Sequence, residues 1–320
     1  MTLITCIGEL LVDFLPTEEG GRTTGFRMHP GGSLLNVAVA TARLGQPVAL
    51  AGKVGTDFFG RYLRGHAERE GVDLRWLLDS PAPTTLAFVA LEHGEPAFVF
   101  YGDGAADSLF APGDVPDGLL DETAILHVGS ISLLRGTTPE AVLATFERLQ
   151  GRALLSLDPN LRPGLVQDEV AYRALLDRLI SLADVVKLST ADLGWLLAGR
   201  SASEATATLL AHGPALVVVT RGAAGVHAVR AGGTAFDVPA EAVPVVDAVG
   251  AGDAFNAGLL TRLAELGATN RSAVLALSDD VLRDVLRFAG VVAALNCTRP
   301  GADSPSRAEV ESLLLAQTPS

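Results

Sequence analysis

Short apolar runs alternate with helical patterns along most of the chain. Runs rich in aliphatic and β-branched residues predict strands at Leu3–Ile7, Val48–Ala51, Ala124–Val128, Ala153–Leu157, Asp184–Leu188 and Leu216–Thr220. Apolar residues at helical spacing predict helices over Ser33–Leu44, Phe58–Glu70, Pro139–Leu149, Glu169–Leu182, Ala191–Leu197, Ser203–His212, Ala251–Leu266, Asp280–Leu295 and Arg307–Leu315. This alternation indicates βαβ units around a mostly parallel sheet, and therefore an α/β protein.

Two segments interrupt the alternation. Phe14–Met28 is polar and Gly-rich where a helix should follow the first strand, and Thr84–Tyr101 has the pattern of a β-hairpin around His93-Gly-Glu-Pro96. Together they predict a small β-sheet that stands off the main domain, with segments at approximately 12–29 and 84–103. Such a lid would keep water away from a reactive group, whereas the alternative is a hairpin without a role.

Composition narrows the class of protein. The 320 residues suffice for one large domain or two small ones, and because no repeat or linker interrupts them we expect a single domain over 1–320. A net charge of −13 argues against a broad surface for nucleic acid or anionic membrane. Only Cys6 and Cys297 are cysteines, and the N-terminus lacks a secretion-signal pattern, so a cytoplasmic protein without a disulfide framework is expected. No apolar run approaches the length of a membrane span.

The segment Asp247-Ala-Val-Gly-Ala-Gly-Asp-Ala-Phe255 carries the most chemical information. A β-type lead-in, Val243–Val246, is expected to give way to a helix at this point. The start of a helix offers unpaired N–H groups and the positive end of a dipole, and small residues let an anion approach them. An acid at such a place suits proton removal from a hydroxyl, so Asp253 with Gly250, Ala251 and Gly252 predicts phosphoryl transfer to an alcohol.

Further polar residues follow predicted strands, where α/β proteins place ligand groups. Gly31 and Gly32 open a helix in which Ser33 would cap and Asn36 would point its amide at hydroxyls, although a routine helix start explains the same pattern. Asp13, placed at the end of the first strand, suits a sugar diol, or is a turn residue. Arg162 suits phosphate or sugar oxygens, or belongs to a structural turn.

Other features bear on a nucleotide. A buried strand runs into a glycine turn at Thr220-Arg-Gly222-Ala-Ala-Gly225, which would place backbone beside a nucleotide or form a plain tight turn. Lys53 and Lys187 are the only lysines in an arginine-rich chain, so both places either need a compact ammonium or are accidents of composition. The P-loop and dinucleotide-binding patterns both fail, and no zinc-type ligand spacing is present.

The order of these pieces resembles the ribokinase-like (PfkB) carbohydrate kinases, and most closely their fructokinase branch. The resemblance runs from Ile7-Gly-Glu9 to Gly301-Ala302 and includes Gly31-Gly-Ser-Leu-Leu-Asn36, Asp158-Pro-Asn-Leu-Arg162 and Asp247–Asp253. It implies a three-layer ribokinase-like fold, in which helices flank a mostly parallel central sheet and a small β-sheet forms a lid. It also implies ATP and Mg²⁺, with K⁺ in some relatives. A lid with an exposed β surface could pair with a second copy, so we expect a homodimer that forms through the lid.

The resemblance also implies roles for single residues. Asp253 would be the base, and Gly250, Ala251 and Gly252 would form the anion hole. Sugar would contact Asp13, Gly31, Gly32, Asn36, Lys53, Tyr101 and Arg162. The nucleotide would lie along Lys187, Ser189, Thr220, Gly222, Gly225 and Gly290. Asp192 would hold magnesium through water, and the place of the potassium ion would match Asp247, Val249, Asn296, Arg299, Gly301 and Pro305.

Three departures from the family pattern affect this assignment. Ala248 and Val249 replace two threonines that follow Asp247 in many relatives, which removes hydroxyl contacts. Ser189-Thr-Ala-Asp192 replaces an Asn-x-x-Glu element, so the carboxylate for magnesium is shorter. Gly102 replaces the arginine that usually follows the lid aromatic, which removes a cation that relatives acting on acidic sugars use.

The sequence therefore leads to one main hypothesis, an ATP-dependent kinase for a primary hydroxyl of a small neutral sugar, first of all fructose at O6. The alternatives within the class are kinases for ribose, a nucleoside or 2-keto-3-deoxygluconate. Outside the class, the alternatives are a non-catalytic sugar-binding regulator on the same fold and, more distantly, a dehydrogenase.

Overall fold

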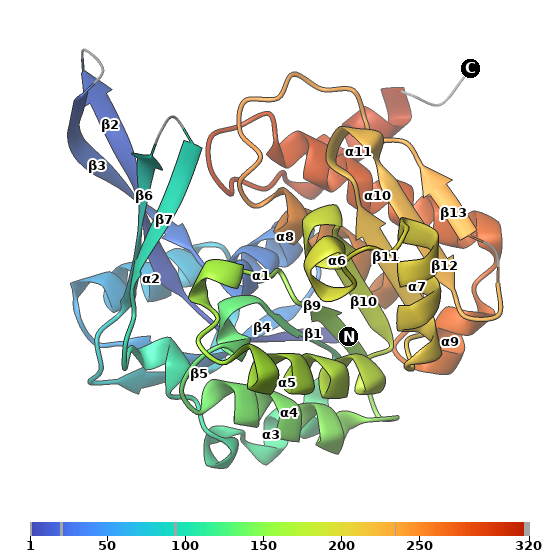
Figure 1. The fold of residues 1–320 in the computed structure, drawn as a ribbon, viewed down its shortest axis with the longest axis horizontal. Coiled ribbons are helices and arrows are strands. Elements are labelled where there is room, and N and C mark those ends of the chain that lie inside the picture. Colours follow the sequence, from blue (N-terminus) through green and yellow to red (C-terminus); the bar gives the residue numbers. More distant parts are fainter. Residues whose placement is uncertain (1, 20–21, 93–94, 234, 317–320) are drawn as a thin grey trace.

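In the computed structural model, helices cover both faces of a central sheet, and a second, smaller sheet projects from one end (Figure 1). The structure describes residues 2–19, 22–92, 95–233 and 235–316. Within these ranges the helices are α1 Ser33–Arg43, α2 Phe58–Arg69, α3 Asp117–Glu122, α4 Thr138–Leu149, α5 Glu169–Leu182, α6 Thr190–Leu196, α7 Ala202–Ala211, α8 Ala251–Glu265, α9 Arg271–Ala276, α10 Asp279–Asn296 and α11 Arg307–Ala316. The three-layer ribokinase-like arrangement is confirmed.

The central sheet, among these described residues, has nine strands in the order β13-β12-β11-β10-β9-β8-β1-β4-β5. Its strands are β1 Leu3–Ile7, β4 Val48–Gly55, β5 Asp73–Ser80, β8 Thr123–Gly129, β9 Leu154–Asp158, β10 Val185–Ser189, β11 Leu216–Thr220, β12 Val226–Arg230 and β13 Ala235–Val238. All pairs from β11 to β5 are parallel, and only β12 and β13 add antiparallel pairs at one edge. The parallel strands consequently end at one common edge, where α/β proteins bind ligands.

Two hydrophobic clusters fill the spaces between the sheet and its helices. One contains the inner faces of α1, α2, α8 and α10, and the other contains those of α3, α4, α5 and α7. Successive strand residues divide between them, as Val218 and Val219 of β11 do, because side chains alternate across a strand. This two-sided burial explains the continuous apolar runs in the sequence.

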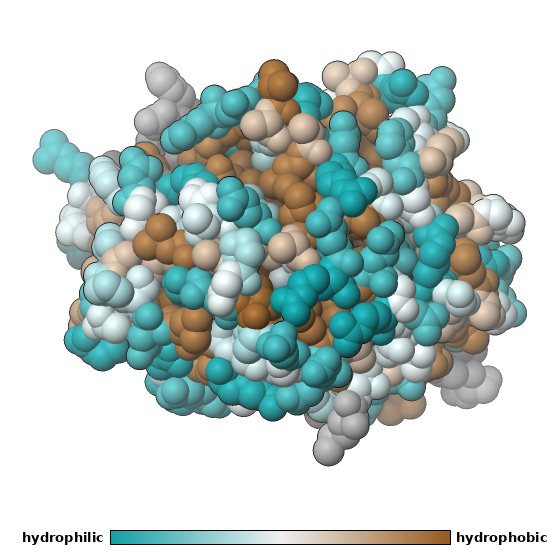
Figure 2. Space-filling view, turned by 90° about the horizontal axis from the view of Figure 1, so that it is seen from below, coloured by the Kyte–Doolittle hydropathy of each residue, from teal (hydrophilic) through white to brown (hydrophobic). Residues whose placement is uncertain are grey.

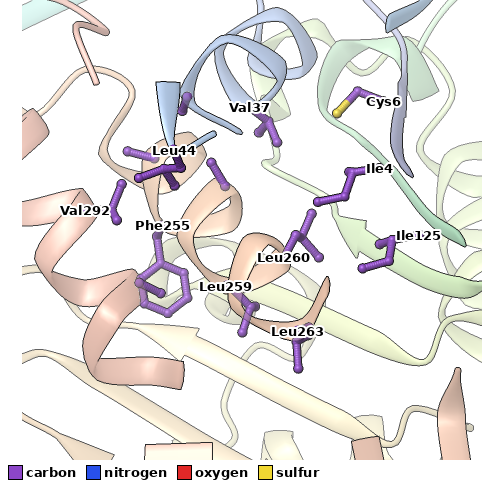
Figure 3. Close-up of a cluster of buried hydrophobic side chains, with 14 of the residues drawn as sticks. Ile4, Cys6, Val37, Leu44, Ile125, Phe255, Leu259, Leu260, Leu263 and Val292 are labelled. Atoms are coloured by element: carbon purple, nitrogen blue, oxygen red, sulfur yellow. The ribbon is translucent and has the colours of Figure 1, made fainter. Parts of the chain in front are cut away.

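Helix α8 lies in the middle of the first cluster (Figure 3). Its residues Phe255, Leu259, Leu260 and Leu263 are buried among side chains from α1, α10 and the sheet, including Val37, Leu44, Val292, Ile4 and Ile125. Full burial of each such side chain stabilises the fold by roughly 1.5–3 kcal/mol, so the helix is firmly held. The turn at its N-terminus, which carries Asp253, therefore has a rigid support.

The second sheet, again within the described part of the chain, has four strands in the order β3-β2-β6-β7: β2 Leu11–Glu19, β3 Arg22–Gly31, β6 Thr85–Glu92 and β7 Glu95–Tyr101. Phe14 of β2 stacks on Phe88 of β6 with ring centroids 4.6 Å apart, and meets Phe59 of α2 edge-on at 5.8 Å. The small sheet predicted from the two interrupting segments is confirmed, and these rings anchor it to the main domain. The turn of the predicted hairpin, at 93–94, lies outside the described residues.

The structure corrects several details. Residues 243–246 are irregular rather than strand-like, and Asp13 lies within β2 of the small sheet rather than at the end of β1. Sequence patterns did not predict β5, β12, β13, α3 or α9. Strands β5 and β13 form the two edges of the sheet and β12 lies next to β13. At these edges, exposed polar residues such as Asp79 and Asp237 interrupt the apolar pattern.

Hydrophilic and hydrophobic residues are interspersed over the face drawn in Figure 2. No helix within the described ranges is long and apolar enough to span a lipid bilayer.

Candidate active site

A cavity of about 350 Å³ opens at the common edge of the parallel strands, between the main domain and the small sheet. Of the residues expected from sequence, it brings together Asp13, Gly32, Asn36, Arg162, Lys187, Ser189, Asp192, Thr220, Val249, Gly250, Gly252 and Asp253. These come from loops, helix starts and strand ends far apart in the chain, so the fold brings half of the expected site residues together around one cavity.

Asp253 is the most tightly held group in the cavity. It lies in the first turn of α8 and is only 7% exposed. Ser33 Oγ donates to one carboxylate oxygen at 2.6 Å, and Asn36 Nδ2 donates to the other at 2.9 Å. Burial raises the pKa of Asp253 above its usual range, while these two hydrogen bonds lower it. A carboxylate with a raised pKa and free lone pairs suits proton transfer.

The backbone beside Asp253 offers hydrogen-bond donors. Gly250 precedes α8 in a left-handed conformation, with φ of 74°. Within the described part of the chain, the amides of Gly252 and Asp253 have no acceptor. A Cβ added at Gly252 would lie 2.9 Å from Lys187 Nζ, so only glycine leaves this approach to amide and ammonium open. Ala251, between Gly250 and Gly252 in sequence, is the first residue of α8 but does not line the cavity. These donors form a suitable anion site.

A buried ion pair lies beneath the anion site. Lys187 Nζ is 2.8 Å from Asp158 Oδ2, and Asn256 Nδ2 donates to the same oxygen at 2.7 Å. Burial lowers the pKa of Lys187, but its interaction with Asp158, with a further contribution from Asp253, raises it above the usual value. Lys187 is therefore a permanent cation at the wall of the cavity.

Acidic groups gather at the end of the cavity nearest the small sheet. Burial, followed by the charge of Asp253, raises the pKa of Asp13 to about 6, while Arg162 lowers it. Gly31 ends β3 directly beside the Asp13 carboxylate. The Arg162 guanidinium is exposed and folds back onto Asn160, where it donates to Asn160 Oδ1 at 2.8 Å.

Four residues expected at the nucleotide lie at or beyond the cavity wall formed by the end of β11. Thr220 ends β11, and Gly222 and Gly225 lie in the turn that follows it, η5 Gly222–Ala224 and its cap. Gly290 lies within α10 with open space beside it. Only Thr220 of these four lines the cavity itself.

Asp192 forms a capping box with Ser189 at the start of α6. Its Oδ2 accepts from Ser189 N at 2.8 Å and Ser189 Oγ at 2.6 Å, and its Oδ1 accepts from Leu161 N at 2.8 Å. Direct metal ligation would compete with these bonds, so the side chain suits contact with a metal-bound water better. The described residues contain no cluster of three or more His, Cys, Asp or Glu side chains that could hold a metal ion.

A second polar cluster lies behind the anion site. Asp247 accepts from Val249 N at 3.0 Å and from Gly301 N at 2.8 Å, and Asn296 Nδ2 donates to Val249 O at 2.8 Å. No cationic side chain pairs with Asp247 in the part of the chain that the structure describes. The uncompensated carboxylate and nearby oxygens fit a monovalent cation. Arg299 instead pairs with Glu309, and Pro305 is buried nearby.

Two expected sugar contacts lie elsewhere. Lys53 Nζ donates to Leu109 O at 3.0 Å and pairs with Asp114 at 2.6 Å, outside the lining of the cavity. Tyr101 is 63% exposed at the end of β7, whereas its neighbour Phe100 lines the cavity. The reason is the alternation of side chains along β7, which turns only one of the pair inward. Their contacts with sugar stay predictions.

The structure adds residues that sequence reasoning did not select as site residues: Glu9, Leu11, Ser33, Phe100, Ser130, Ile131, Asn160 and Ala248. Ser33 was expected to cap α1, but the cap is Gly32, and the Ser33 hydroxyl reaches Asp253 instead. For Glu9, the sequence did offer a signal, because Glu9 closely follows β1 and ligand groups in α/β proteins follow parallel strands.

Comparison with known proteins agrees with this geometry. A family model described as pfkB family carbohydrate kinase matches residues 1–309. This chain belongs to that family. The pfkB-family kinase is 36% identical to a fructokinase of Rhizobium leguminosarum bv. trifolii over 286 residues, covering 88% of this chain and 86% of that protein.

Solved structures of fructokinases are similar to this pfkB-family kinase over nearly the whole chain. The fructokinase of Xylella fastidiosa with bound ATP has a TM-score of 0.92 and 34% identity, with 98% of each chain covered. A fructokinase double mutant of Vibrio cholerae O395, bound to fructose, ADP and potassium ion, has a TM-score of 0.86 and 31% identity, also with 98% of each chain covered. The chain is therefore a carbohydrate kinase.

Proposed function

We propose that this kinase transfers the γ-phosphoryl group of ATP to the primary O6 hydroxyl of fructose, giving fructose 6-phosphate and ADP. The observation that carries the proposal is the buried Asp253 carboxylate, held in the first turn of a helix where the amides of Gly252 and Asp253 have no acceptor among the described residues. The similarity to proteins named fructokinase supports the choice of acceptor.

In the proposed reaction Asp253 accepts the proton of the sugar hydroxyl. The hydroxyl oxygen forms a bond to the γ-phosphorus, the bond between that phosphorus and the β,γ-bridging oxygen breaks, and ADP leaves. Amides of Gly252 and Asp253, together with Lys187, would stabilise the charge on the phosphoryl group in transfer. The small sheet would exclude water from the sugar end.

The charges around the sugar end favour a neutral acceptor. Three carboxyl groups, those of Glu9, Asp13 and Asp253, line that end. The Arg162 guanidinium offsets the charge of Asp13, and Lys187 offsets that of Asp253. A carboxylate or phosphate on the acceptor would lie against these acids, which costs free energy in a partly buried site. The arrangement therefore supports fructose over an acidic sugar such as 2-keto-3-deoxygluconate.

A sugar panel tests the proposal. ADP release is measured with fructose, ribose, glucose, 2-keto-3-deoxygluconate and adenosine, each with MgATP, and the phosphorylated position is read by ³¹P–¹H NMR. We expect kcat/KM for fructose to exceed that for every other acceptor by at least about tenfold, since one lost polar contact in a matched site costs that much or more. Binding of fructose without turnover would instead support a regulator.

The cofactors follow from the same site. We propose that Mg²⁺ acts with the β- and γ-phosphates and that Asp192 reaches it through a bound water, because both Asp192 oxygens already accept protein hydrogen bonds. We further propose that residues 1–320 act as one cytoplasmic kinase domain, with lid segments at about 12–29 and 84–103.

The Asp247 cluster predicts activation by potassium. A monovalent cation there would neutralise Asp247 and stabilise the loop that leads into α8. At constant ionic strength we expect kcat to be several-fold higher in KCl than in tetramethylammonium chloride, and we expect Asp247→Asn to abolish that difference. Steady-state rates in the two salts check this, and equal rates for the unsubstituted enzyme would contradict it.

The exposed aromatic surface of the lid predicts a homodimer. Phe26 is 48% exposed and Tyr101 63% exposed on the small sheet, away from the core. We propose that a second copy covers them. Light scattering after size exclusion should give the dimer mass, and Phe26→Lys should shift it to the monomer mass, because burying an unpaired charge opposes association. A monomer mass for the unsubstituted protein would refute the interface.

A further inference from the structure

Helix α1 begins without a side-chain cap of its own. Its N-cap is Gly32, at φ of 102°, where an added Cβ would lie 2.7 Å from Glu9 O. Any other residue at this position would therefore be strained and would collide with backbone. The capping function is supplied from outside the helix, because Glu9 Oε1 accepts from the amide of Ser33 at 2.9 Å. A carboxylate at this place also complements the helix dipole.

Glu9 is itself fixed in the core. It is fully buried, its amide donates to Ser132 Oγ at 2.8 Å, and the same hydroxyl donates to Glu9 Oε2. Burial raises the pKa of Glu9 to about 7, while the hydrogen bond from Ser132 lowers it. Glu9 thus joins the end of β1 and the residues after β8 to the start of α1.

External capping leaves the Ser33 hydroxyl available. A serine at a helix start ordinarily turns its oxygen back to the helix amides, but Ser33 Oγ points at Asp253 and donates at 2.6 Å. Asn36, one turn further along α1, donates to the second oxygen at 2.9 Å. Two donors on one helix therefore hold both oxygens of the carboxylate.

Asn36 and Ser33 differ in how far their side chains are exposed to the cavity in which a sugar would bind. Asn36 is partly exposed to the cavity, whereas Ser33 is 8% exposed. A hydroxyl of a bound sugar would compete with Asp253 for the Asn36 amide, whereas the buried Ser33 hydroxyl would stay on Asp253. We propose that Ser33 is a positioning residue for the general base and that Glu9 acts through Ser33, an inference that rests on the proposed role of Asp253.

Other charges also act on Asp253. From β9, Asp158 raises its pKa, and from β10, Lys187 lowers it. From β2, Asp13 interacts unfavourably with it, and Arg162 offsets the charge of Asp13. These groups are unchanged in a Ser33 variant, so the loss of the hydroxyl alone is expected to raise the pKa of Asp253.

Carboxyl ¹³C NMR of the full-length protein labelled at Asp Cγ tests this without turnover. Asp253→Asn assigns the resonance, and the titration is recorded for the unsubstituted protein and for Ser33→Ala. We expect the Asp253 midpoint to rise by about one pH unit in Ser33→Ala, the size expected for one hydrogen bond to a charged group. The acidic limb of kcat should move upward with it. An unchanged midpoint would overturn the proposal.

Four further variants separate positioning from general damage. Ser156→Ala removes another buried serine, which bonds to His127 at 3.0 Å outside the cavity lining, and should leave the Asp253 midpoint unchanged. Glu9→Gln keeps an acceptor for the Ser33 amide and should shift the midpoint less than Ser33→Ala does. Glu9→Ala should shift it in the unsubstituted background but not in the Ser33→Ala background, since Glu9 acts through that hydroxyl.

The outcomes stay distinct from a failure of the proposed function. A raised midpoint without turnover of any sugar would uphold the contact and refute the kinase reaction on fructose. Turnover of fructose with an unchanged midpoint in Ser33→Ala would do the reverse. If Glu9→Ala fails to fold, by circular dichroism, the Ser33→Ala and Glu9→Gln titrations decide the proposal by themselves.

Discussion

Replacing Asp253 with Asn is expected to lower kcat by roughly 10²-fold or more, the scale of a lost general base. The amide has nearly the shape of the carboxylate, and its oxygen accepts from Ser33 as before, so sugar should still bind. The amide nitrogen faces Asn36 Nδ2, so the hydrogen bond from Asn36 is lost. The fold should nevertheless weaken little, because burying a neutral amide costs less than burying a charge. Steady-state kinetics, fructose binding by calorimetry and thermal unfolding measure the three effects separately.

The control for this experiment is Asp114→Asn, which neutralises a half-buried acid that pairs with Lys53 outside the cavity lining. It should leave kcat within about twofold, because neither side chain of this pair lines the cavity and a partly exposed ion pair adds little to the stability of the fold. If Asp253→Asn retained a kcat within a factor of two of the unsubstituted enzyme, Asp253 would have no part in proton transfer.

Replacing Lys187 with Met is expected to lower the free energy of unfolding by about 3–5 kcal/mol, the cost of breaking a buried ion pair from one side. The side chains of Lys187 and Asp158 are 5% and 2% exposed, so water cannot solvate the remaining carboxylate. Asn256 would still donate to it but brings no charge. Urea-induced unfolding measures the loss.

The chain contains a matched control, because its other lysine forms a more exposed pair. Lys53→Met removes the partner of Asp114, where the two side chains are 21% and 25% exposed, and should cost about 1 kcal/mol or less. The double variant Lys187→Met/Asp158→Asn should regain most of the stability lost in Lys187→Met, since neither charge of the buried pair remains. It should not regain kcat, because Lys187 also lines the cavity. Equal losses for the two lysine variants would contradict the buried pair.

The sequence predicted those strands that are buried on both faces, because their residues are apolar throughout. The apolar runs at Leu3–Ile7 and Leu216–Thr220 became strands with those same bounds, because strands covered by helices on both faces need apolar residues throughout. The edge strands β5 and β13 were not predicted from the sequence, because many of their side chains are exposed to solvent.

The sequence likewise predicted the helix start at α8, with its glycine turn and its acid. Small residues and an acid at a helix start indicate an anion site and a base wherever they occur, since unpaired amides are a property of the helix itself. Lys53 and Lys187, by contrast, are both lysines near the end of a parallel strand, β4 and β10. Nothing local distinguished a lysine that pairs with Asp114 from one buried beneath the cavity.

The sequence by itself determined the alternating α/β architecture, the separate small sheet and the helix start that places Asp253 after the glycine turn, because all three depend on residue order and local backbone geometry. Only the tertiary structure decided what holds Asp253. Its donors lie more than 200 positions away in sequence, at separations of 220 and 217, and Glu9 frees one of them by capping α1. Such contacts depend on which strand ends and helix starts meet in space, and no local pattern encodes that meeting.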